Sequence, residues 1–130
     1  MMEKNNPLTL VVELSNADET VRITARKKLV NLGGRAVPYL IAALYEPNDL
    51  ARKEAAIALS EIHDPTAPTR LVKDLENENP EIRWHAAQCL TYLNRAAVIS
   101  LLNALVKHFD SVWLREGARH VFHVLMSDEI

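Results

Sequence analysis

Apolar residues recur along the chain in a register that four arginines mark. Arg22, Arg52, Arg83 and Arg115 follow one another at intervals of 30, 31 and 32 residues. Relative to each arginine, Ala or a large apolar residue stands at −1, +3, +7 and +10, which lie within one stripe of a helix. A period of this size is typical of a supersecondary unit that is copied and stacked in tandem. The pattern therefore predicts four equivalent helices whose apolar stripes face a common core.

An N-cap residue stands four positions before every arginine. These residues are Asp18, Asn48, Asn79 and Ser111. Their side chains accept hydrogen bonds from free N–H groups of a first helical turn, and Pro80 fits the first helical position. At +11, Gly33 and Asn94 favour the left-handed conformation that ends a helix. Each predicted helix therefore runs from its cap to about eleven residues past its arginine.

A shorter apolar segment precedes each of these helices and predicts a second, antiparallel helix. Its anchors are leucine pairs one helical turn apart, namely Leu10 and Leu14, Leu40 and Leu44, Leu71 and Leu75, and Leu101 and Leu105. Short links make consecutive helices antiparallel neighbours. We expect an all-α fold, an α-solenoid of four helical hairpins (about eight helices) in a right-handed superhelical stack. It forms a single domain over 1–130, with repeats at about 7–33, 34–63, 64–94 and 95–127.

The segment 79–93 reads Asn-Pro-Glu-Ile-Arg-x-x-Ala-Ala-x-x-Leu-x-x-Leu, and it and its three weaker copies resemble HEAT repeats. The short period resembles the HEAT-like subtype named after phycobilisome lyases. The resemblance covers about residues 7–126 and implies a concave interaction surface lined by the second helix of each hairpin. It also implies a structural arginine ladder that bonds acidic or turn groups, for which Glu19, Asp49 and Asp110 are available. The family includes adaptors, lyase subunits, a hydroxylase and glycosylase relatives, so the resemblance specifies the fold rather than an activity.

Composition favours a protein or peptide partner. A net charge of −2 and a pI near 6.2 give no overall positive field, which argues against nucleic acid and anionic membranes. The sequence contains no signal-peptide pattern and no run of 18 apolar residues, so we expect a cytoplasmic protein. The single cysteine, Cys89, is expected to pack in the core.

Each second helix is expected to face the preceding repeat with one side and the following repeat with another. The residues between these two sides are expected to line a binding groove. The predicted partner-binding residues are Lys53, Glu54, Trp84, His85, Gln88, Tyr92, Glu116, His120 and His123. Trp84, Gln88 and Tyr92 recur at four-residue spacing, and aromatic residues dominate binding hot spots. For Trp84, contact with a ligand and packing against a neighbouring helix are equally good interpretations.

Enzymatic activity is not expected, and the sequence offers no catalytic residues, cofactor or metal. Glu116, His120 and His123 have ligand chemistry, but their span along a helix is about 10 Å, too long for all three to bind one ion. A site made of two of them with His85 is the feasible alternative to solvated surface histidines. The hydroxylase relatives carry His-Glu dipeptides after the arginine, and none occurs at those positions here. A lyase-type or metal-dependent subunit that acts with a partner is the alternative.

The residues expected to line the groove include both lysines and glutamates, which predicts weak affinity for DNA.

The last repeat carries aromatic residues where a loop meets a helix. Phe109 and Trp113 either cover the edge of this repeat or form a patch that pairs two chains, so a weak homodimer through the C-terminal repeat is a further expectation. The outward flanks of the end repeats are polar, with Lys28 at one end and Arg119 and His123 at the other. Polar end flanks are typical of a nearly complete solenoid.

Overall fold

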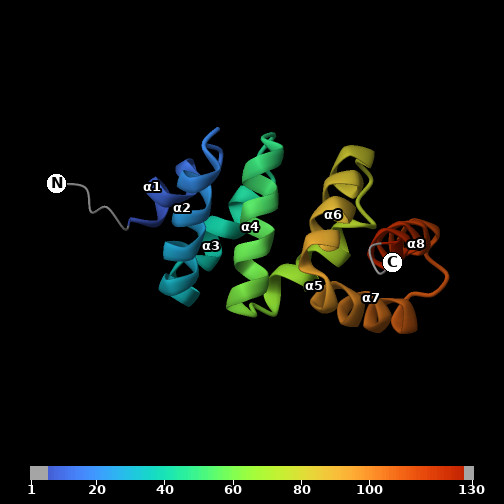
Figure 1. Ribbon diagram of the computed structural model, residues 1–130. Coiled ribbons are helices and arrows are strands. Elements are labelled where there is room, and N and C mark those ends of the chain that lie inside the picture. Colours follow the sequence, from blue (N-terminus) through green and yellow to red (C-terminus); the bar gives the residue numbers. More distant parts are fainter. Residues whose placement is uncertain (1–5, 128–130) are drawn as a thin grey trace. The chain divides into compact units, whose positions relative to one another are not determined.

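The computed structural model describes residues 6–127, which contain eight α-helices, one 3-10 turn and no strand. They form two compact units, one ending at Asp64 and the other beginning at Pro65. Each unit consists of two helical hairpins (Figure 1). The prediction of an all-α fold built from HEAT-like hairpins is confirmed, whereas the single domain and the handedness of the stack stay predictions.

The first unit contains α1, α2, α3 and α4. Their bounds are Pro7–Glu13, Glu19–Leu32, Val37–Ala43 and Asp49–Ile62, and the 3-10 turn Gly33–Arg35 links α2 to α3. Within each hairpin the two helices pack together, and α2 also packs along α4 (Figure 1). The second helices of the two hairpins are therefore direct neighbours within this unit.

The second unit contains α5, α6, α7 and α8. Their bounds are Thr66–Asp74, Pro80–Leu93, Arg95–Lys107 and Val112–Ser127. Here α5 packs on α6 and α7, and α6 packs on α8. The pairing of second helices seen in the first unit thus recurs, with α6 and α8 in the places of α2 and α4.

The predicted N-caps are confirmed in all four second helices. The side chains of Asp18, Asn48, Asn79 and Ser111 accept hydrogen bonds from the backbone N–H groups of Thr20, Ala51, Glu81 and Leu114. Each bond satisfies a donor that the helix itself leaves unpaired. The sequence therefore determines where each of these helices begins.

Three of these helices end at a residue with positive φ. Gly33 and Asn94 have φ of 60° and 53°, as their residue types predict. His63 is fully left-handed, with φ 62° and ψ 38°, a conformation that the sequence did not indicate for histidine. At the fourth such position Met126 continues α8, which runs on to Ser127.

The repeated apolar columns form the core. Ala25, Ala55, Ala86 and Ala118 at +3 are all buried, as are the leucines at the anchor positions of α1, α3 and α5. Small buried residues at +3 allow a neighbouring helix to approach each second helix closely. Cys89 is buried, as its predicted packing role requires.

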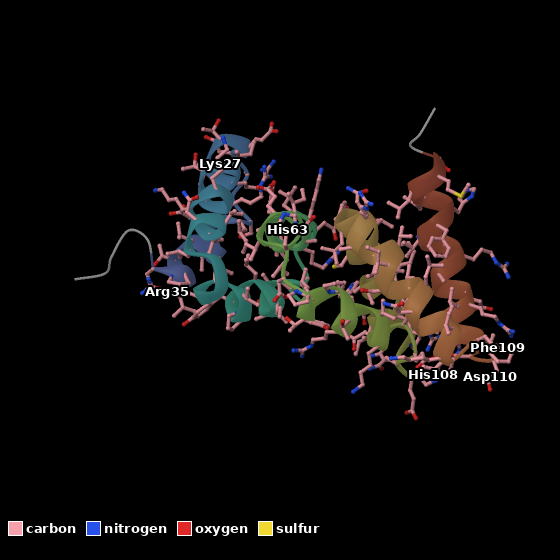
Figure 2. The ribbon with its side chains drawn as sticks, turned by 90° about the horizontal axis from the view of Figure 1, so that it is seen from below. Lys27, Arg35, His63, His108, Phe109 and Asp110 are labelled. Atoms are coloured by element: carbon pink, nitrogen blue, oxygen red, sulfur yellow. The ribbon has the colours of Figure 1, made fainter. Side chains whose placement is uncertain are left out.

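The first helix of the last hairpin differs from its counterparts. It spans 13 residues in α7, against 7 in α1 and α3. Its outer side exposes Ile99, Leu102 and Val106, and Phe109 follows in the turn to α8, where it projects into solvent (Figure 2). The last hairpin therefore exposes several large apolar side chains along α7 and in the turn after it.

Candidate functional site

A groove between α6 and α8, here called the aromatic groove, gathers three of the predicted binding residues. It has a volume of about 300 Å³. Its walls include Trp84 on α6 and Trp113, Glu116 and His120 on α8, and Leu75 lies at its base. Because α6 packs on α8, the side of α6 that carries Trp84 and Ala87 meets the side of α8 that carries Trp113, Gly117 and His120.

Trp84 stands at the opening of this groove. Its indole is 52% exposed, and its ring centroid lies 5.7 Å from that of His120, with the planes tilted by 49°. Tilted pairs at this distance are a favourable arrangement of aromatic rings. Trp84 therefore packs against the ring of His120 on the neighbouring helix and leaves about half of its surface accessible, and its contact with a ligand stays a prediction.

Trp113 forms the other aromatic wall by stacking on Arg83. The guanidinium carbon lies 4.3 Å from the ring centroid, within the range of a cation–π contact. Nη1 of the same arginine donates to the backbone oxygens of Asn77 and Glu78, at 2.7 and 3.1 Å. Arg83 thus links the turn before α6 to the first turn of α8. Trp113 is still 40% exposed, so its edge-covering and chain-pairing roles both stay predictions.

Gly117 lets α8 approach the end of α5. A Cβ atom at this position would lie 2.9 Å from Cδ2 of Leu75, closer than a normal contact. The missing side chain therefore leaves room for the leucine that closes the base of the aromatic groove.

The arginine column is mainly a structural device. Nη1 of Arg22 donates to the backbone oxygens of Asn16 and Ala17, and Nη1 of Arg52 donates to that of Glu46. Arg52 also pairs with Asp49. Three arginines thus bond the turn that links the two helices of their own hairpin. Arg115 is exposed, and no hydrogen bond of its side chain is seen within residues 6–127.

The remaining predicted residues lie elsewhere. His85, Gln88 and Tyr92 are half-buried on α6 and do not line the aromatic groove, while Lys53 is exposed on α4 in the first unit. Glu54 is only 6% exposed, and its Oε1 lies 2.5 Å from Nη1 of Arg26. The carboxylate of Glu54 therefore serves the packing of α4 against α2.

His123 lines a different surface, here called the C-terminal groove. It lies between α7 and α8, has a volume of about 580 Å³ and has a largely apolar lining that includes Leu105, Phe122 and Met126. A third hollow, of about 310 Å³, lies between α5 and α7 and contains none of the predicted binding residues.

Neither a metal-ligand cluster nor a membrane-spanning helix is found in the described part of the chain. Within residues 6–127, no three His, Cys, Asp or Glu side chains are arranged so that they could hold one metal ion, so Glu116, His120 and His123 do not form a ligand cluster. In the same part of the chain, every helix is too short or too polar to cross a membrane.

Sequence reasoning underrated Trp113 and Arg83 as groove residues. The signal was present, because Trp113 lies two residues before an arginine of the repeat register and Arg83 occupies that register one repeat earlier. Only the packing of α6 on α8 shows that the two positions face each other.

Comparison with known families agrees with this architecture. A family model described as HEAT repeats matches residues 7–78, which extend from α1 to the turn before α6. The search of curated proteins gave no match. The match covers more than half of the chain, in which capped second helices, buried alanine and leucine columns and turn-binding arginines recur. The chain belongs to the HEAT repeat family.

Proposed function

We propose that this chain is a protein-interaction module and that its aromatic groove binds a peptide segment of a protein partner. HEAT repeats commonly act as interaction scaffolds, which supports the general class. The observation that carries the specific proposal is Trp84, a large aromatic side chain 52% exposed at the opening of a groove with a second indole in its wall.

The chemistry of the groove suits an apolar anchor residue. Leu75 and Ala87 supply apolar surface, and the two indoles supply broad contact area with few rotatable bonds. Glu116 and His120 are exposed on α8 and offer an acceptor and a donor to the backbone beside such an anchor. An aliphatic or aromatic side chain of the partner would contact the apolar surface, and the backbone N–H and C=O groups beside it would bond to the polar residues.

Several further features belong to the same proposal. On α6, His85, Gln88 and Tyr92 extend the partner contacts, and Lys53 on α4 makes a separate contact of the first unit. The module acts in the cytoplasm without catalysis of its own, and its partners are proteins rather than nucleic acids. The relation to the phycobilisome-lyase subtype is part of the proposal as well. The near-neutral charge of the chain supports the choice of partner class.

Replacement of Trp84 tests the proposal. Wild-type protein, Trp84→Ala and Leu8→Ala are immobilised, partners are captured from the native cell extract, and the affinity of each recovered protein is then measured separately. Leu8 is a similarly exposed apolar residue on α1, far from the groove in sequence, and serves as the matched control. We expect Trp84→Ala to weaken binding at least about tenfold, because truncation of an aromatic hot spot removes much of an interface's free energy.

Stability distinguishes a binding role from a core role. Because Trp84 is half-exposed, its truncation should lower the free energy of unfolding by less than about 1 kcal/mol. Partners that bind Trp84→Ala as tightly as the wild type, or a collapse of the fold in that variant, would refute the aromatic groove as the binding site.

A further inference from the structure

The last helix repeats an arginine pair that occurs in the second helix of the chain. Residues 22–26 read Arg-Ile-Thr-Ala-Arg, and residues 115–119 read Arg-Glu-Gly-Ala-Arg. In the other two repeats, the position of the second arginine holds Ala56 or Ala87. Arg119 is therefore the counterpart of Arg26, and the surroundings of Arg26 show how this chain satisfies such a pair.

In the first unit, Arg22 and Arg26 form ion pairs with two glutamates on α4. Nη1 of Arg26 lies 2.5 Å from Oε1 of Glu54, and Nε of Arg22 lies 3.6 Å from its Oε2. Nε of Arg26 also lies 3.5 Å from Oε1 of Glu61. Glu54 and Glu61 are seven residues apart and thus lie on one side of α4, with Ala58 between them. A helix with this pattern covers the arginine pair and the apolar residues beside it.

In the last hairpin the corresponding surface is open. Arg115 and Arg119 line the C-terminal groove with Phe122, the half-buried counterpart of the fully buried Leu29, and with Ala118, which is buried like its counterpart Ala25. Both arginines are exposed, and no acidic side chain of the described residues pairs with either of them. The groove thus has an almost wholly apolar lining, beside which two arginines have no acidic partner among residues 6–127.

The neighbouring surface of α7 is open in the same way. Leu102 is 52% exposed, whereas its counterpart one repeat earlier, Val72, is 7% exposed because α5 packs against α7. At both helices of the last hairpin, therefore, residues that another helix covers elsewhere in the chain face solvent.

We propose that the C-terminal groove binds an acidic amphipathic helix of a partner protein, with two glutamates seven residues apart and a small residue between them. Its glutamates pair with Arg115 and Arg119 as Glu54 and Glu61 pair with Arg22 and Arg26. Its small residues rest against Ala118 and Phe122. A second copy of this chain does not supply such a helix through α4, because α2 already covers that side of it.

This site is independent of the aromatic groove. Its residues lie on a different side of α8 from Glu116 and His120, and the two grooves share no lining residue. Loss of binding at one groove therefore leaves the other proposal unaffected.

A designed peptide tests the proposal on the full chain. The probe is a labelled, hydrocarbon-stapled, alanine-rich helix with Glu at two positions seven residues apart, and the control peptide carries Gln at both. Fluorescence anisotropy at low salt is expected to show the Glu peptide binding about tenfold more tightly, because charge-assisted pairs between carboxylates and guanidinium groups are stronger than neutral contacts. The preference should diminish as salt is raised.

Variants of the protein locate the site. Arg119→Ala should abolish the preference for the Glu peptide, whereas Arg95→Ala, which removes an exposed arginine at the start of α7, should keep it. Arg119→Glu should instead prefer a peptide with Lys at the two positions. Equal binding of the Glu and Gln peptides by the wild type would overturn the proposal, and so would an unchanged preference in Arg119→Ala.

Sedimentation provides the remaining test. Three results together would refute the partner-helix proposal: the wild type dimerises at micromolar concentration, Arg119→Ala is monomeric, and the Glu peptide does not compete with dimerisation. They would show that a second copy of the chain occupies this groove. A monomeric wild type that binds the Glu peptide supports it.

Discussion

Glu54 illustrates how the role of a single charged residue depends on its neighbour. Its position on the helix wheel placed it in the expected groove, but the structure surrounds it with Arg22 and Arg26 of the preceding helix. At 6% exposure, its carboxylate replaces lost hydration with contacts to two guanidinium groups. Lys53, the next residue in the chain, stays exposed.

Replacement of Glu54 should therefore destabilise the chain more than replacement of its neighbour. We expect Glu54→Ala to lower the free energy of unfolding by about 1–3 kcal/mol, because Arg26 loses its closest partner while it is still mostly buried. Lys53→Ala, the matched control, should change it by less than about 0.5 kcal/mol. Urea denaturation measures both, and equal effects of the two variants would contradict the structural role of Glu54.

At the scale of the element, each second helix is defined by signals within its own sequence. A cap side chain begins it, an apolar stripe orients it, and in three cases a residue with positive φ ends it. The arginine then joins the helix to the turn before it, as Arg83 does through Asn77 and Glu78. Because α6 carries both Trp84 and Arg83, its first turn positions one side of the aromatic groove.

The cap of α6 offers a direct test of this local control. In Asn79→Ala, the N–H of Glu81 loses the oxygen that now accepts from it at 2.9 Å, and we expect a loss of about 1 kcal/mol. Asn79→Asp should retain the stability, and Asn79→Gly should lose only a few tenths of that amount. Thermal unfolding followed by circular dichroism distinguishes the three variants. If Ala and Asp behaved alike, the cap would have no energetic role.

At the scale of the whole molecule, the chain consists of two units of two hairpins each, with the boundary between Asp64 and Pro65. In repeat proteins, stability is approximately a sum of the terms within repeats and between neighbours. A change in the core of one unit should therefore act first on that unit.

Hydrogen exchange can show whether the units open separately. Leu29→Ala removes a fully buried side chain of the first unit, and such changes cost about 2–5 kcal/mol. We expect exchange to accelerate in α2 and α4 with little change in α6 and α8, and Leu90→Ala in the second unit should produce the reverse pattern. Uniform acceleration over the whole chain in both variants would show a single cooperative unit instead.

The sequence alone determined the helices, their caps and the faces they bury. These features depend on contacts between residues a few positions apart, so that spacing, cap residues and apolar columns specify them. The repeat could also be identified from the sequence, because the same cap, arginine and apolar positions recur in four copies and each copy supports the assignment of the others.

Only the tertiary structure decided which functional side chains meet. Trp113 stacks on Arg83 from thirty residues away, and Glu54 is withdrawn from solvent by Arg26. The exposure of Arg119, in contrast to its counterpart Arg26, likewise depends on whether another helix lies beside it. Helical periodicity gives the direction of a side chain on its own helix, but the neighbour it meets depends on how whole helices pack.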